Sequence, residues 1–280
     1  MQPKHFSEVH TEAKVLEAGR QRGSEKSCSK EKEQSMLLWR KRSIPLAMGM
    51  SVVGRVNMSS SNLIRWGGFV ALVGSVIGIL YFPFHSAAYL SSPQGGAANL
   101  ASPWVAAWYE PFARVFHPLL TFASPYVVYT TFGKFSILVV LGFLAGVLAL
   151  HSRQSAHAGR LEKWGFRVLL VGTVFGTVGA FGEYYTPYLD SSFLAFSAPG
   201  LLLMMFGSPL FGIGTLRARM TPRLGGWLLT IGGFPGIILM TLLVGHLSGG
   251  LLLLDFAWVV LGYALWTQRG APAVRSPRGR

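Results

Sequence analysis

The chain has few charged residues and almost no cysteine. Asp, Glu, Lys and Arg make up 13% of its 280 residues, against roughly 25% in ordinary soluble domains. The single cysteine, Cys28, excludes a disulfide within one chain and a zinc site built from cysteines. Phosphate-binding glycine loops, zinc-protease motifs and a Ser-His-Asp grouping with plausible spacing are also missing. The sequence therefore favours a protein without enzyme activity, leaves a membrane-embedded enzyme or redox carrier as the third interpretation, and predicts no cofactor and no metal-binding motif.

Apolar residues dominate what is present. They account for 51% of the chain, the mean hydropathy is +0.42, and 34 residues are glycine. The formal net charge is +14, but the basic residues lie in short clusters beside apolar runs instead of forming one patch. This arrangement is typical of the loops of membrane proteins and not of a nucleic-acid-binding surface. The sequence predicts an all-α integral membrane protein that lies in a lipid bilayer and binds no nucleic acid.

Six apolar runs come close to the ~20 residues that a helix needs to cross a bilayer. The second has an alternative start at Pro125. In the fourth, Pro199-Gly200 and Ser208-Pro209 predict a kink or interrupted backbone hydrogen bonding. The expected spans are residues 66–84, 135–150, 164–182, 193–214, 225–243 and 251–266.

The distribution of basic residues predicts the orientation. Arg and Lys concentrate before the first run, after the second and fourth, and after the sixth, whereas the other loops hold few. By the positive-inside rule, six spans with both termini in the cytoplasm satisfy every crossing. We expect the protein in the cytoplasmic (inner) membrane, with anionic lipid meeting its basic cytoplasmic face. The residues that carry this prediction are Arg65, Arg153, Arg160, Lys163, Arg217, Arg219, Arg223 and Arg269.

The transmembrane domain is expected at 58–269, between a flexible basic tail at 1–57 and a short basic tail at 270–280. Met58 is an alternative start of the native chain. The longest loop, 85–124, carries a turn signal and many aromatic residues. This loop is predicted either to contain a helix along the membrane interface or to form a structured cap on the bundle.

One pattern occurs three times, most clearly at Arg223-Leu224-Gly225-Gly226-Trp227. A basic residue and a large apolar residue precede a glycine, and a Gly-x-x-x-Gly pair begins nine positions after the basic residue. The spacing predicts three helical hairpins, unless glycine-rich composition alone produces it. Such pairs let helices approach closely within one chain, or between two copies of it. The glycines expected to pack are Gly74, Gly78, Gly142, Gly146, Gly172, Gly176, Gly232 and Gly236.

Few ionisable residues fall within the apolar runs. Asp255 is the main candidate for function because an acidic group inside a membrane span is costly. His246 and Glu183 are expected near the same outer surface and complete the set of candidates. With Asp190, His85 and His117 they are predicted to form an outward-facing proton or metal site, or else to be solvated groups without a joint role.

The sequence pattern of Leu216-Arg217-Ala218-Arg219, leading into Arg223-Leu224-Gly225-Gly226-Trp227, resembles that of many small bacterial membrane proteins. That resemblance implies no activity. The expected role is therefore structural, or interaction with a membrane-protein partner or a second copy of the chain. The alternative is a small transporter or channel that uses the kinked fourth span and Asp255.

Overall fold

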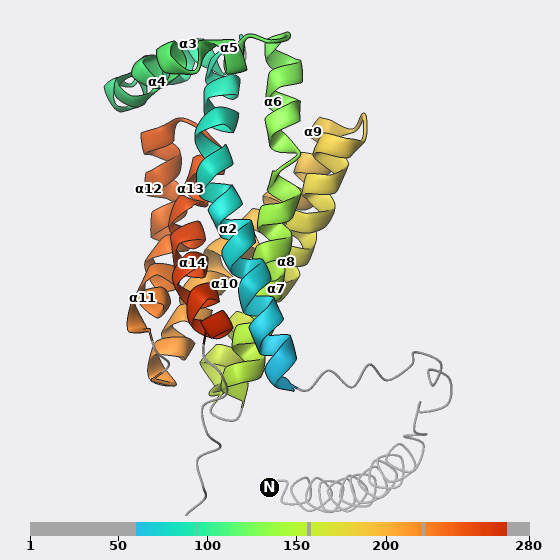
Figure 1. Ribbon diagram of the computed structural model, residues 1–280, viewed down its shortest axis with the longest axis vertical. Helices are drawn as coiled ribbons and strands as arrows, with labels where there is room; N and C mark the ends of the chain where they lie inside the picture. Colours follow the sequence, from blue (N-terminus) through green and yellow to red (C-terminus); the bar gives the residue numbers. More distant parts are fainter. Residues whose placement is uncertain (1–59, 94, 156–157, 220–221, 268–280) are drawn as a thin grey trace, which may run out of the picture. The chain divides into compact units, whose positions relative to one another are not determined.

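The computed structural model describes residues 60–93, 95–155, 158–219 and 222–267. The predicted tails, and the question of whether Met58 is the start, lie outside these residues. Within them every regular element is a helix (Figure 1). The prediction of an all-α protein is confirmed for the described part of the chain.

Four stretches are long and apolar enough to cross a membrane. The helices end later than the apolar runs do, because polar and aromatic residues continue them beyond the expected spans. The second stretch begins at Pro125, the earlier of its two expected starts. The four stretches are α2 (Ser60–Leu90), α6 (Pro125–Gly133) with α7 (Ser136–Gln154), α8 (Arg160–Tyr185), and α9 (Leu189–Ser192) with η2 (Phe193–Ser197) and α10 (Ala198–Arg217).

The last two expected spans differ from the prediction. The fifth consists of α11 (Arg223–Gly232) and α12 (Phe234–Val244), which meet at a bend of 67°. Pro235 lies in the first turn of α12, where it has no N–H to continue the α11 hydrogen-bonding ladder. The sixth, α14 (Leu252–Thr267), has 16 residues and is shorter than a full crossing requires. By length and composition, the described residues thus contain four candidate spans, or five if the bent pair is one span.

The fourth span is less bent than its prolines suggest. Its helices are not separated by a bend above 40°. A π-helical turn, η2, precedes Pro199, and the N–H of Ala198 bonds to the carbonyl of Phe193. Pro209 lies inside α10. The irregularity is therefore one widened turn on the N-terminal side of Pro199, and the sharp break is in the next span.

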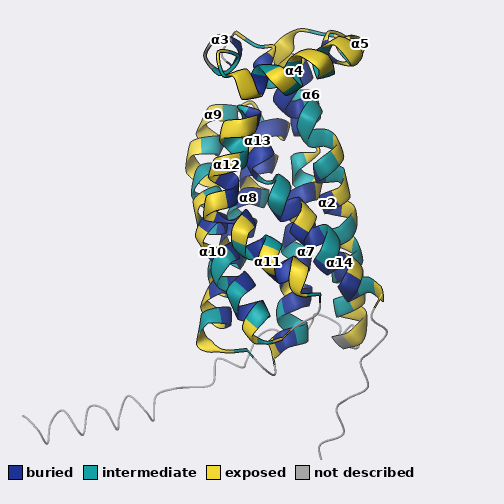
Figure 2. Ribbon diagram, turned by 90° about the vertical axis from the view of Figure 1, so that its left-hand side faces the viewer, coloured by how far each residue is buried: buried dark blue, intermediate teal, exposed yellow. Residues whose placement is uncertain are grey.

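Six helices pack in a ring. In chain order α2, α7, α8, α10, α11 and α14 each pack on the next, and α14 packs back on α2. Phe143, Phe211 and Trp258 are buried inside. Figure 2 shows buried residues turned inward and exposed ones along the outer faces. Large apolar side chains are among those exposed, including Leu80 and Leu242, as expected for helices surrounded by lipid.

Glycines lie where the helices of this ring approach most closely. A Cβ added to Gly74 of α2 would lie 2.9 Å from the Cα of Gly142 in α7. A Cβ on Gly172 of α8 would lie 2.9 Å from the backbone nitrogen of Met204 in α10. Neither neighbour is a flexible side chain that can move aside. These two contacts hold the backbones of neighbouring helices at a distance that a larger residue does not allow.

The predicted outer loop contains three helices that lie across one end of the domain (Figure 1). They are α3 (Gly96–Asn99), α4 (Pro103–Val115) and α5 (His117–Leu120). The ring of Phe84, near the end of α2, packs against those of Phe112, Phe116 and Phe132 at centroid distances of 5.1, 5.0 and 5.3 Å. We call α3, α4 and α5 the cap. The cap contains one 13-residue helix, α4. It also packs on the bundle, through the contacts of Phe84 with Phe112 and Phe116.

Replacing Gly172 with leucine is expected to destabilise the protein. The side chain meets the backbone of α10 at the crossing with α8, and overpacking of this kind costs about 1–3 kcal/mol. Gly159→Leu is the matched control, since a Cβ there meets nothing within 4 Å. The measurement is the thermal unfolding midpoint of each variant in one detergent. Equal midpoints for the two variants would contradict the packing role of Gly172.

Candidate functional site

A cavity of about 540 Å³ lies within the ring of helices, near the cap. Residues of α2, α7, α8, α10 and α12 line it, together with residues of α3, α6, α9, η2 and α13 (Leu247–Gly250). Its size falls within the roughly 300–1,000 Å³ of small-molecule sites. Part of its wall is apolar, formed by Val140, Phe193, Leu201 and Met204.

Six aromatic or imidazole rings border the cavity as one connected cluster. Tyr81, His85 and Tyr89 lie four residues apart on α2, so they share one face of that helix. His85 stacks on Tyr129 of α6 at 4.5 Å, and His246 packs on Tyr89 at 4.4 Å. The six rings of this cluster are Tyr81, His85, Tyr89, Tyr129, Tyr184 and His246.

Long hydrogen bonds connect four of these rings. Tyr129 Oη lies 3.5 Å from His246 Nε2 and 3.4 Å from Tyr184 Oη, and Tyr184 Oη lies 3.3 Å from His85 Nε2. His246 Nδ1 accepts from the N–H of Ser248, so the proton of the neutral imidazole is on Nε2. His246 Nε2 then donates to the Tyr129 hydroxyl, which donates to the Tyr184 hydroxyl. The Tyr184 hydroxyl in turn donates to His85 Nε2. His85 then carries its proton on Nδ1, a buried atom without a partner in the protein.

The turn after α12 positions His246. Gly245 ends the helix with a φ of +79°, in the left-handed region that glycine adopts most readily. His246 then caps α13 by accepting from the Ser248 backbone N–H at 3.2 Å. The Ser248 hydroxyl lies 2.9 Å from that of Ser86 on α2, which links the turn to the first helix. Burial among these groups lowers the pKa of His246 to about 4, so the ring is neutral at pH 7.

Two carboxylates and no basic residue of the described chain line the cavity. Glu183 of α8 is only 8% exposed, and its Oε1 has no hydrogen-bond partner in the protein. Ser197 and Tyr184 lie beside the same carboxyl group. Asp190 of α9 is exposed. The cavity thus has one buried and one accessible carboxyl group.

The structure separates the three main candidates. Glu183 and His246 both line the cavity, together with His85 and Asp190. Asp255 is buried against Gly78 of α2, outside the cavity lining, and its Oδ1 has no partner. His117 is exposed in the cap, where its Nδ1 lies 3.4 Å from the Thr121 hydroxyl. The six groups expected at one outward-facing site therefore do not form a single cluster.

The described residues contain no group of three or more His, Cys, Asp or Glu placed to hold a metal ion. In the cavity, His246 Nδ1 is occupied by Ser248, and both histidine Nε2 atoms face tyrosine hydroxyls. The imidazoles are held by hydrogen bonds and are not aimed at a common point. The donor set suits binding of an organic ligand better than coordination.

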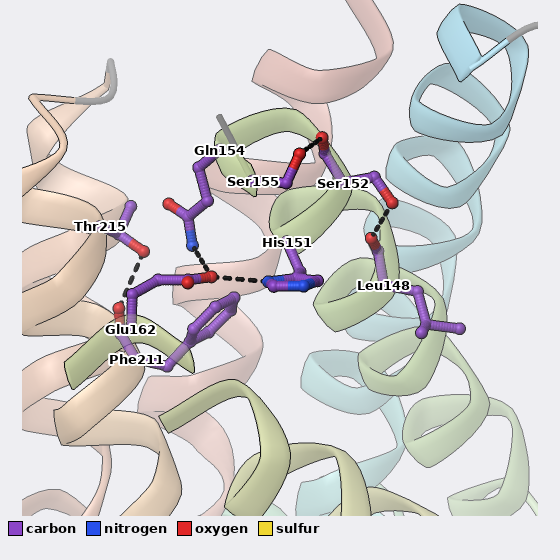
Figure 3. A network of polar contacts seen from close by, with 8 residues as sticks. All are labelled: Leu148, His151, Ser152, Gln154, Ser155, Glu162, Phe211 and Thr215. Carbon is purple, nitrogen blue, oxygen red and sulfur yellow. Dashed lines mark hydrogen bonds and ion pairs between the residues drawn. The ribbon is translucent and has the colours of Figure 1, made fainter. Parts of the chain in front are cut away.

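A second polar cluster lies where α7 ends and α8 begins (Figure 3). His151 Nδ1 donates to Glu162 Oε1 at 2.7 Å, and Gln154 Nε2 donates to the same oxygen at 3.0 Å. Glu162 is 1% exposed. Phe166 stacks on the His151 ring at 3.6 Å. This cluster ties together the two helices that the α7–α8 connection joins, although Glu162 Oε2 keeps no partner in the protein.

Sequence reasoning missed most of the residues that make the cavity polar. The four tyrosines were not candidates, although the spacing of Tyr81, His85 and Tyr89 indicates one polar face on the first span. Glu162 was also missed, because it stands among basic residues in a segment predicted to be a loop.

No family model, curated protein or solved structure matches this chain.

The His246→Asn variant is expected to lose less stability in acid than the wild type. The folded-state pKa of His246 is lowered from 6.5 to about 4, so the unfolded chain binds the proton first as the pH falls. The contribution of His246 to the free energy of unfolding is full above pH 6.5. It decreases by at most about 3 kcal/mol as the pH falls towards 4. Asparagine can still cap α13. The measurement is the unfolding midpoint of both proteins in detergent between pH 7 and pH 4. Parallel profiles would exclude His246 as a titrating group.

Removing the partner of Glu162 is expected to be costly. His151→Phe leaves the buried Glu162 carboxyl group without its imidazole donor, and the loss of one partner of a buried hydrogen bond costs about 1–3 kcal/mol. Adding Glu162→Gln removes the uncompensated charge and should recover part of that loss. The measurement is denaturation of the single and double variants in mixed micelles. A double variant no more stable than His151→Phe would contradict the pairing.

Proposed function

We propose that this protein is a multi-pass membrane protein that binds a small organic ligand in the cavity beneath the cap. The observation that carries the proposal is a set of buried polar atoms without partners in the protein. Four of them lie on residues that line this one cavity. They are His85 Nδ1, Ser136 Oγ, Glu183 Oε1 and Thr241 Oγ1.

Leaving such atoms without a hydrogen bond lowers the stability of the folded protein. A buried polar group without a hydrogen bond costs about 1–3 kcal/mol, and native proteins leave few of them. A ligand with polar groups of its own satisfies several at once, while its apolar part lies against Val140, Leu201 and Met204. A few fixed polar groups in a mainly apolar cavity are the usual composition of a small-molecule site.

Transport is the second candidate function, and two features of the cavity wall favour it. Phe193 and Ser197 belong to the π-helical turn of the fourth span, and Thr241 belongs to α12, beyond the 67° bend of the fifth. Broken helices at a binding site are characteristic of transporters. In this proposal the fifth span takes the part that the sequence assigned to a kinked fourth span and Asp255.

The proposed topology keeps six crossings with both ends on the cytoplasmic side. The first helix begins beside the end of the last, since a Cβ on Gly68 of α2 would meet Leu265 and Gly262 of α14. An even number of crossings accounts for that arrangement, with α14 as a short sixth span. Basic residues stand near the helix ends opposite the cap, at Arg153, Arg160, Arg217 and Arg223, where anionic lipid is the proposed partner.

Three helical hairpins remain our proposal for the internal repeat. It is supported by equivalent contacts at the first glycine of each copy. Gly67 meets α7, Gly165 meets α10 and Gly225 meets α14, so each lies against the next membrane helix along the chain. Association with a second copy or another membrane protein is also proposed, through the cap, where the Trp104 side chain is 70% exposed.

Filling the cavity is expected to abolish ligand binding without disrupting the fold. Ala180 lines the cavity, and Ala180→Leu adds three carbons there. Ala195→Leu makes the same change on an exposed position of η2. The experiment screens small amphipathic molecules for a rise in the thermal unfolding midpoint of the protein in nanodiscs. Ligands at about 100 times their Kd stabilise the native state by about 3 kcal/mol.

Compounds that stabilise the wild type should also stabilise Ala195→Leu and have little effect on Ala180→Leu. Stabilisation that persists in Ala180→Leu would place the ligand elsewhere. A screen in which no compound stabilises the wild type would count against a ligand-binding function.

A further inference from the structure

The charge of the cavity is opposite to that of the chain. The protein has a formal net charge of +14, yet the charged residues that line the cavity are Glu183 and Asp190, without a Lys or Arg from the described part of the chain. His246 is neutral at pH 7 because burial holds its pKa at about 4. A cavity with carboxylates and no positive group favours cations and repels anions.

Glu183 lacks the cation that a buried carboxylate normally pairs with. Among the described residues, an ion pair joins His151 and Glu162 at the other polar cluster. Ser197 and Tyr184 lie beside the Glu183 carboxyl, but its Oε1 has no partner in the protein. Ionising a buried carboxyl group is costly when no cation accompanies it. A ligand with a positive group would supply the missing partner.

The tyrosines add a second source of cation binding. Tyr81, Tyr89, Tyr129 and Tyr184 all border the cavity. A cation within about 6 Å of a tyrosine ring face gains roughly 0.5–2 kcal/mol, with the larger values where water is excluded. Tyr184 adjoins the Glu183 carboxyl, so one ammonium group can contact a carboxylate and an aromatic ring together.

We propose that the ligand of this cavity is a small organic cation. Its ammonium group pairs with Glu183 and packs against the neighbouring tyrosines, and its apolar body lies against Val140, Leu201 and Met204. The proposal rests on the proposed ligand-binding function and adds the chemical class of the ligand. Asp190, which is exposed, provides a negative group on the way to the buried carboxylate.

The test compares three probes with one apolar body and different head groups: phenethylammonium, phenethyl alcohol and phenylacetate. Their affinities for the full-length wild-type protein in nanodiscs are measured by calorimetry at pH 7 and constant ionic strength. We expect phenethylammonium to bind about tenfold more tightly than the alcohol. Phenylacetate should be the weakest of the three, because it places a second negative charge beside Glu183.

Variants assign the preference to Glu183. Glu183→Gln keeps the shape of the side chain, so it should remove the advantage of phenethylammonium over phenethyl alcohol. Glu110→Gln, which removes an exposed acid from α4 outside the cavity, should leave the affinities of all three probes unchanged. Because the head-group ranking needs only the wild type, a Glu183→Gln protein that fails to fold does not prevent the test.

Equal affinities for the three probes, tightest binding of phenylacetate, or no binding of phenethylammonium would each overturn the assignment of a cationic ligand. So would a preference for phenethylammonium that survives in Glu183→Gln. The first two results would leave ligand binding in the cavity standing. That function is judged separately by the library screen with Ala180→Leu and Ala195→Leu.

Discussion

Inside a bundle surrounded by lipid, a polar group must find its partner within the protein, in a ligand or in the water of a cavity, since the hydrocarbon supplies none. The two polar clusters of this domain meet that constraint in different ways. Around Glu162 the chain supplies its own donors, from His151 and Gln154. Around Glu183 no Lys or Arg of the described residues lines the cavity, and unpartnered atoms of other helices border it. The first cluster fastens two helices together, and the second is arranged for something that is not part of the chain.

The cavity depends on departures from regular helix packing. The first helix continues to Leu90, six residues past its expected end, and this extension brings His85 and Tyr89 to the cavity. The fifth span turns by 67° where a straight helix would continue. The left-handed Gly245 then places His246 within reach of Tyr89 and Tyr129. The extension of α2 and the turn at Gly245 lie at the end that carries the cap, and the bend lies in the middle of its span. The glycine contacts of Gly74 and Gly172 keep neighbouring helices close.

The apolar runs predicted the helical class and the approximate positions of the four long apolar stretches, because hydrophobic length is a direct requirement of the bilayer. They did not predict where a helix bends. Proline stands in both the fourth and the fifth span, yet Pro199 follows a widened turn while Pro235 begins a new helix at 67° to the last. Gly233, with a ψ of −128°, permits that break. The outcome at each proline depends on the residues around it and on the packing of neighbouring helices.

The position of a residue along its helix could be predicted from the sequence. The direction in which its side chain points around the helix axis could not. Asp255, His246 and Glu183 were all expected near one surface, and the structure brings the last two to one cavity. Asp255 instead faces Gly78 of α2, because α14 packs that side on the first helix. A rotation of about 100° separates consecutive residues of a helix, so one position decides whether a carboxylate borders a cavity or a glycine. Contacts among all six helices determine this rotation. Residues from Tyr81 to Leu251 line the cavity, so no single stretch of the sequence predicts it.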